Sequence, residues 1–316
     1  MAQAHTKART FARGVVIKEA AIREELTPGS KKLYFMFGGI AAGLAMPPFE
    51  FYSSAKIIEE NKIFLRDFSQ AWYQNGLPGV GHTFYSVGDF IEQKIAELEP
   101  EEVFFVGNSM GGYAAILFAS LVGKGTAIAF APQTFVSPLK RLRHREQRWS
   151  KQVNKMHLRT ALKPHVWDLE AWLKARQSGT KMNNAKIEIY VARDPLAQAG
   201  AASKPPARAS LKTATGPGVS RTPVDEESRL DYLHAAYLQN FGAVTVHTFP
   251  VGGHNLVKQL RDEGALPAIL SGTYAEASTR TEPKHGPRSG TRPLSRPPSV
   301  VGAPPERAPS GATKPR

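Results

Sequence analysis

The chain has 316 residues, of which 41% are hydrophobic and 22% are charged, and it contains no cysteine. This length suits one large α/β domain or two small ones. No apolar run reaches the roughly 18 residues that a membrane-spanning helix needs. Without cysteine, disulfides, thiolate metal sites and a cysteine nucleophile are excluded. The first residues lack an apolar stretch of the secretory type, so we expect a cytoplasmic protein with no membrane span.

The net charge of +14 is concentrated in two patches. Residues 138–165 hold nine Lys or Arg against Glu146 alone, and residues 280–316 hold eight against two acids. Outside these patches the charges balance. A basic total therefore does not indicate nucleic-acid binding by the body of the protein, and we expect at most a weak polyanion contact through the C-terminal patch.

Short apolar runs alternate with helical patterns along most of the chain. The runs predict strands at 32–37, 62–65, 103–106, 126–130, 186–192 and 244–249. The helical patterns lie at 86–98, 112–122, 227–237 and 255–262. Strands that alternate with helices predict an α/β protein with a mostly parallel, doubly wound sheet. Residues 15–26 are expected to add an antiparallel edge pair.

Composition divides the chain into one domain and a tail. The domain is expected to span residues 1–275, with a helical, cap-like insertion at about 133–185 and a flexible surface loop at about 197–224. Residues 276–316 are rich in Pro, Arg, Ser and Gly and nearly free of large apolar side chains. Such a segment cannot bury a core, so we expect a disordered tail.

A G-x-S-x-G pentapeptide, Gly107-Asn108-Ser109-Met110-Gly111, follows the predicted strand 103–106 and precedes the helix 112–122. In such a strand–turn–helix the serine stands on a sharp turn that raises its hydroxyl above the sheet edge, and the glycines prevent collisions. The context predicts that Ser109 is a catalytic nucleophile.

A serine nucleophile needs a histidine base that a carboxylate orients. His254 lies just beyond the strand 244–249, where a loop imidazole can reach across the sheet edge. Asp194 directly follows the strand 186–192 and is the first choice for the acid. Asp231 is the alternative, since its separation from His254 also suits one helix plus one strand.

Acyl transfer also needs N–H groups that stabilise an oxyanion. The backbone N–H of Met110, after the nucleophile, is one candidate. The N–H of Ile40, in the Gly-rich loop after the strand 32–37, is the other. The chain contains no P-loop, no dinucleotide fingerprint and no H-E-x-x-H motif, so neither a cofactor nor a metal is implied.

These motifs together resemble the α/β-hydrolase superfamily over residues 10–272. The stretches FGGIAAGLAMPPFEFY, FLRDFSQAWYQNGL, GNSMGGYAAILFA and FAPQTF are similar to a group of bacterial α/β-hydrolase-like proteins of poorly defined substrate, some linked with cell-surface glycan loci. The resemblance implies an α/β-hydrolase fold and esterase-like activity. It also favours Asp231, because a Leu-Asp-x-x-His-Ala segment is prominent in that group.

The basic insertion falls where hydrolases carry a cap over the active site. There Arg141, Arg143, Arg145 and Arg148 could attract an acidic substrate, or they could form a solvated helix face.

The sequence thus predicts a serine hydrolase that cleaves a small-molecule, glycan or lipid ester through a Ser-His-Asp triad and an acyl-enzyme. One alternative is an acyltransferase that uses the same triad. The other is a non-catalytic, hydrolase-like binding protein that uses its basic insertion and tail.

Overall fold

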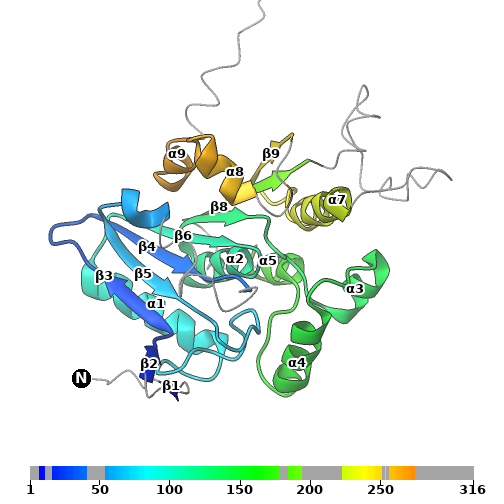
Figure 1. The fold of residues 1–316 in the computed structure, drawn as a ribbon, viewed down its shortest axis with the longest axis horizontal. Helices are drawn as coiled ribbons and strands as arrows, with labels where there is room; N and C mark the ends of the chain where they lie inside the picture. Colours follow the sequence, from blue (N-terminus) through cyan, green and yellow to red (C-terminus); the bar gives the residue numbers. More distant parts are fainter. Residues whose placement is uncertain are drawn as a thin grey trace, which may run out of the picture.

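The computed structural model describes residues 7–10, 16–40, 54–177, 184–193, 223–250, 253 and 256–274. In these ranges seven strands form one sheet in the order β3-β5-β4-β6-β7-β8-β9, and β1 and β2 form a separate pair (Figure 1). The strands are β1 (Lys7–Thr10), β2 (Val16–Glu19), β3 (Ile22–Glu25), β4 (Lys32–Phe37), β5 (Asn61–Leu65), β6 (Glu102–Asn108), β7 (Lys124–Phe130), β8 (Asn184–Ala192) and β9 (Val244–Phe249).

The predicted mostly parallel sheet is confirmed. Every neighbouring pair from β5 to β9 is parallel, and only β3 runs antiparallel, against β5. The edge differs from the expectation for residues 15–26. Its second half, β3, supplies the antiparallel edge strand, whereas β2 pairs with β1 outside the main sheet.

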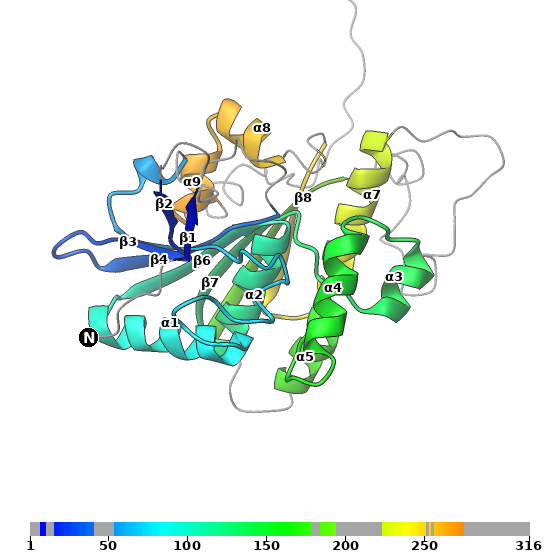
Figure 2. The same ribbon diagram turned by 60° about the horizontal axis from the view of Figure 1, so that its bottom comes forward.

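Helices cover both faces of the sheet (Figures 1 and 2). One face carries α1 (Phe84–Leu98), α2 (Met110–Val122) and α5 (Leu169–Gln177), and the other carries α8 (Leu256–Asp262) and α9 (Leu266–Leu270). The remaining helical segments are η1 (Ser54–Ile57), α3 (Pro138–His144), α4 (Ser150–Thr160) and α7 (Pro223–Ala236), of which α7 packs against β8. None of the helices in the described ranges combines the length and apolarity that a bilayer crossing requires.

Two hydrophobic cores lie on opposite sides of the sheet. Along β4, Leu33, Phe35 and Phe37 enter the core under α1 and α2, while Tyr34 and Met36 enter the core under α8 and α9. Successive side chains of a strand point to opposite faces, so a strand buried on both needs an unbroken apolar sequence. This is why the run LYFMF could be read as a central strand.

The helical insertion after β7 is confirmed as a helical segment by α3, α4 and α5. Its two ends are held together, because the Val136 N–H donates to the Trp167 carbonyl at 2.7 Å and the Leu169 N–H donates to the Thr134 carbonyl at 2.9 Å. The segment that contains α3 and α4 therefore begins and ends close together, just after β7. Most of the predicted loop 197–224 and all of the predicted tail 276–316 lie outside the described residues.

Candidate active site

The segments that carry the predicted site residues leave the sheet at one edge. In the parallel register Phe37 is opposite Gly107, Asn108 is opposite Phe130, and Ala192 is opposite Phe249. Hence β4, β6, β7, β8 and β9 all end at the same edge. In parallel α/β sheets this carboxyl edge is where ligands bind.

Ser109 lies on a sharp turn between β6 and α2. Its backbone angles are φ 57° and ψ −117°, a left-handed conformation that is costly for a residue with a side chain. Backbone hydrogen bonds hold it there. The Ser109 N–H donates to the Phe130 carbonyl at 2.9 Å, and its own carbonyl accepts from the N–H groups of Tyr113 and Gln133 at 3.0 and 3.3 Å.

The two glycines of the motif are required by close backbone contacts. A Cβ at Gly107 would lie 2.1 Å from the Gly111 carbonyl oxygen, and a Cβ at Gly111 would lie 2.3 Å from the Phe37 carbonyl oxygen. No side chain fits at such distances. The G-x-S-x-G spacing therefore follows from the contact of the turn with itself and with β4.

The Ser109 hydroxyl is buried at the start of α2. The residue is 4% exposed, and among the described residues its Oγ has no hydrogen-bond partner. It stands at the first turn of α2, where the helix dipole favours negative charge. A buried hydroxyl normally finds a partner, so this one is free to bond with a base or a substrate.

The two oxyanion candidates follow neighbouring strands. Met110 is the first residue of α2, so its N–H has no acceptor within the helix. Ile40 follows β4, which pairs with β6, and its half-buried side chain packs on the core under α1 and α2. Both N–H groups belong to segments that leave the edge at Ser109.

Asp194 and His254 lie outside the described residues, so their side chains are not placed. The residue before Asp194 is described: the Arg193 N–H donates to the Phe249 carbonyl at 2.7 Å and extends the pairing of β8 with β9. In the sequence, Asp194 is the next residue after Arg193, and His254 comes after the last residue of β9.

Asp231 lies in a buried charged cluster, which also contains Glu146, Arg148 and His234. It is fully buried on α7, and its Oδ1 lies 2.6 Å from Arg148 Nη1. Arg148 Nη2 also donates to Glu146 Oε2 at 2.7 Å. One turn along α7, His234 Nε2 lies 3.4 Å from the same Glu146 oxygen. The cluster ties the insertion to α7.

Each member of this cluster has a pKa that follows from burial and neighbours. Burial opposes ionisation of Glu146, but hydrogen bonds with His234 and Arg148 outweigh it, so its pKa lies well below the ordinary 4.5. Burial is the main cause that lowers the pKa of His234 from 6.5. Arg148 is also buried, yet Asp231 and Glu146 raise its pKa above the ordinary value. Near neutral pH the cluster holds an ionised Glu146, a charged Arg148 and a neutral His234.

Sequence reasoning missed Glu146 and His234 as members of a site. One signal was available, since Glu146 is the single acid among the nine cations of residues 138–165. It also missed Gln133, which is 2% exposed and whose N–H contacts Ser109. The Gln133 Oε1 has no hydrogen-bond partner within the described part of the chain.

The four arginines expected to attract an acidic substrate divide into two kinds. Arg148 belongs to the buried cluster, and Arg141 Nη2 donates to the Arg148 carbonyl at 2.8 Å and to Ser150 Oγ at 3.1 Å. These two hold the insertion together. Arg143 and Arg145 are exposed.

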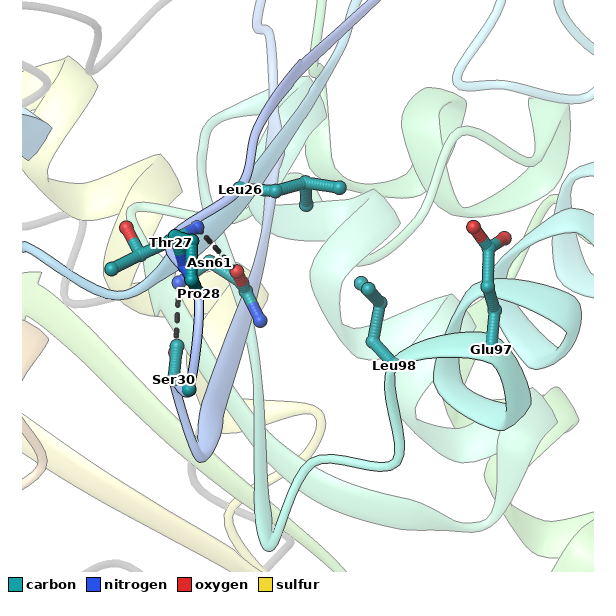
Figure 3. Close-up of a pocket in the computed structure, with 8 residues that line it drawn as sticks. Leu26, Thr27, Pro28, Ser30, Asn61, Glu97 and Leu98 are labelled. Atoms are coloured by element: carbon teal, nitrogen blue, oxygen red, sulfur yellow. Dashed lines mark hydrogen bonds between the residues drawn. The ribbon is translucent and has the colours of Figure 1, made fainter.

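The structure has a hollow at the opposite edge of the sheet (Figure 3). Leu26 lies on one side of it and Leu98, at the end of α1, lies on another. The Thr27 N–H donates to Asn61 Oδ1 at 2.8 Å. These residues lie at the amino ends of β4, β5 and β6, away from Ser109. Among the described residues no group of three or more His, Asp or Glu is arranged to hold a metal.

A sequence model of the alpha/beta hydrolase family matches residues 76–263, more than half of the chain. No curated protein sequence matches it.

Comparison with solved structures gives matches of low sequence identity, of which three are described here. The glycosylation-associated protein complex (Gap123) of Streptococcus agalactiae shares 15% identity over 87% of this chain with a TM-score of 0.46, and this chain covers only 46% of that one. The substrate-bound fluorophosphonate-binding serine hydrolase F of Staphylococcus aureus shares 14% over 84% of this chain and 97% of its own, with a TM-score of 0.48. The capsule O-acetyltransferase of Neisseria meningitidis serogroup A shares 15% over 82% and 96%, with a TM-score of 0.49.

Proposed function

The chain belongs to the alpha/beta hydrolase family, and from this premise we propose that it is a serine hydrolase that cleaves an ester-type acyl bond with Ser109 as nucleophile. One observation carries the proposal. Ser109 is held in a left-handed turn at the start of α2, with a buried Oγ that has no partner among the described residues. A strained backbone and a buried hydroxyl without a partner both cost stability, and neither is needed for packing. Such features are typical of functional sites.

The proposed reaction has two halves. His254 takes the proton of Ser109 Oγ, which attacks the ester carbonyl, while the N–H groups of Met110 and Ile40 hold the oxyanion. The imidazolium then gives its proton to the departing alcohol, and an acyl-Ser109 remains. Water attacks this acyl-enzyme with His254 as base, which releases the acid and restores the serine.

We assign the orienting acid to Asp194, with Asp231 as the alternative. In favour of Asp194, its neighbour in the sequence is Arg193, whose N–H donates to the Phe249 carbonyl at the sheet edge where Ser109 lies. In addition, Asp231 Oδ1 already accepts a hydrogen bond from Arg148 Nη1. Asp231 stays the alternative, with a carboxylate that already contacts Arg148.

The test is covalent labelling with a fluorophosphonate, which reacts with an activated serine, followed by mass spectrometry of the adduct. We expect modification of Ser109, with no labelling in Ser109→Ala and normal labelling in the control Ser137→Ala. A folded wild-type protein that is not labelled, or is labelled elsewhere, would overturn the proposal and favour the binding-protein alternative. His254→Ala should reduce the labelling rate by several orders of magnitude, about 10³-fold or more.

The acid is identified by comparing Asp194→Asn with Asp231→Asn, each checked for folding by circular dichroism. We expect Asp194→Asn to slow labelling strongly and Asp231→Asn to lower the melting temperature while the folded fraction still reacts. The reverse pattern would assign the acid to Asp231. Adding alcohols to a turnover assay then separates hydrolysis from acyl transfer, because a transferase diverts its acyl group to the acceptor.

A further inference from the structure

The most exposed large apolar side chains of the described residues gather on the insertion. Leu139, Leu142, Leu158 and Leu162 are 77%, 79%, 84% and 101% exposed. The other exposed large apolar side chains in the described ranges reach 54% at most, at Ile57. Scattered single leucines on a surface are ordinary, but four nearly bare ones on two adjacent helices are not.

On α4 the exposed positions form one stripe. Val153, Met156 and Thr160 are buried and face the body of the protein. An α-helix has 3.6 residues per turn, so residues that are three or four positions apart lie on the same side of it. On the side away from the three buried residues lie exposed residues: Lys151, Lys155, Leu158, Arg159 and, just beyond the helix end, Leu162. The outward stripe of α4 therefore mixes leucines with cations.

On α3 the same division holds. Lys140 faces inward, with ion pairs to Asp168 and Glu170 at 2.6 and 2.8 Å, and His144 Nε2 contacts the Tyr237 hydroxyl at 2.7 Å. The outward side presents Leu139, Leu142 and Arg143, and no residue of α3 is buried. In both ribbon views α3 and α4 lie at the outside of the molecule, beside α7 (Figures 1 and 2).

Six cations lie on the same two helices as these leucines or within a few residues of their ends. They are exposed, and none forms an ion pair with another described residue: Arg143, Arg145, Lys151, Lys155, Arg159 and Lys163. The cations that do have internal partners, Lys140 and Arg148, point the other way. We call these six cations with Leu139, Leu142, Leu158 and Leu162 the outer insertion surface.

We propose that the outer insertion surface docks the protein on an anionic lipid bilayer. Leucines that enter the acyl boundary gain from burial of apolar area, and Lys and Arg beside them pair with anionic headgroups. Both halves of this chemistry are present among the exposed side chains of α3, of α4 and of the residues next to them.

Two other occupants fit less well. A symmetric dimer through this surface would place its cations against copies of themselves, which is repulsive. A nucleic acid would use the cations, but it offers no apolar phase for four leucines. The lipid surface alone uses both features.

The segment that would dock is joined directly to the residues that contact Ser109. The insertion leaves the sheet just after Gln133, whose N–H donates to the Ser109 carbonyl at 3.3 Å. The docking itself does not depend on catalysis, so it can be tested with Ser109→Ala.

The test uses the full chain and flotation with two kinds of vesicle, phosphatidylcholine alone and phosphatidylcholine mixed with phosphatidylglycerol. We expect binding to the mixed vesicles only. The variant Leu142→Ser with Leu158→Ser should weaken partitioning by about tenfold or more, because two apolar anchors are lost. The matched control, Leu26→Ser with Ile57→Ser, removes exposed apolar side chains elsewhere and should bind as wild type.

The cations are tested in the same assay. Arg143→Gln, Lys155→Gln and Arg159→Gln together should weaken partitioning by about fivefold for each charge. Lys56→Gln with Lys124→Gln, exposed cations away from the insertion, are the control.

Three outcomes would overturn the proposal. They are absence of binding to the mixed vesicles, equal binding to neutral vesicles, and undiminished binding of the leucine variant. The last would show that charge alone is responsible, as for a polyanion partner. Since the tail is present in every variant, its contribution is the same throughout.

Discussion

Arg148 Nη1 lies 2.6 Å from Asp231 Oδ1, although the two residues are 83 positions apart in the chain. The contact joins the segment between α3 and α4 to the middle of α7, and Glu146 accepts from the same guanidinium. Two buried carboxylates thus depend on one arginine. The insertion is fastened to the body by charge as well as by packing.

Replacing this arginine should be strongly destabilising. Arg148→Met leaves Glu146 and Asp231 buried without their cation, and removing one partner of a buried pair costs about 3–5 kcal/mol. We expect a loss of that size in the free energy of unfolding, measured by urea denaturation. The control Arg143→Met, on the exposed side of α3, should stay within about 0.5 kcal/mol of wild type. A small loss for Arg148→Met would show that the cluster does not fasten the insertion.

The buried His234 should make the protein less stable in mild acid. Burial lowers its pKa in the folded state, so below about pH 6.5 the unfolded chain binds a proton that the folded chain excludes. Stability from this group is therefore complete above that pH and is lost as the pH falls. Glu146, whose folded pKa is also lowered, adds a further loss below 4.5.

The measurement is the free energy of unfolding at several values from about pH 7.5 down to about pH 5. His234→Gln should flatten the decline, although His144 and His157, whose pKa values burial also lowers, keep part of it. His165→Gln, at an exposed position, controls for the loss of a histidine. An unchanged slope in His234→Gln would contradict the assignment.

The turn around Ser109 should not tolerate a side chain at Gly111. In Gly111→Ala the new Cβ would meet the Phe37 carbonyl oxygen at 2.3 Å, so β4 or the turn must move. We expect a loss of about 2–3 kcal/mol in unfolding free energy and slower fluorophosphonate labelling of the protein that stays folded. Gly242→Ala is the control, because nothing lies within 4 Å of a Cβ there.

The backbone conformation of Ser109 should lower the stability of the protein. Its φ of 57° is strained for serine and natural for glycine. Ser109→Gly is therefore expected to raise the unfolding free energy by about 1 kcal/mol, while Ser109→Ala keeps the strained backbone and does not. Both variants should lose labelling. A Ser109→Gly protein no more stable than Ser109→Ala would mean that the turn holds no such strain.

Much of the fold could be predicted because local pattern and burial coincide. The apolar run of β4 and the alternation in β9 gave both strands their bounds, and the pattern at Gly112–Val122 identified most of α2. The short α9 was missed, since five residues show too little periodicity. The turn at Ser109 was predicted because its glycines are a local requirement.

The charged cluster could not be predicted, because it joins distant segments. The sequence alone gives no reason to distinguish the nine cations of the insertion, whereas in the structure Arg148 is part-buried and ion-paired and Arg143 is exposed. Which side of a helix faces the protein depends on tertiary packing. The positions of Asp194 and His254 stay predictions.

The backbone hydrogen bonds of Ser109 imply that this residue cannot be displaced by a local fluctuation. Its N–H donates to the carbonyl of Phe130, the last residue of β7, and its carbonyl accepts from the N–H groups of Tyr113 in α2 and of Gln133. Amide protons in such a position exchange with solvent only when the central sheet opens as a unit. Heat inactivation and global melting should therefore coincide, so residual activity after heating reports the fraction of molecules that refold.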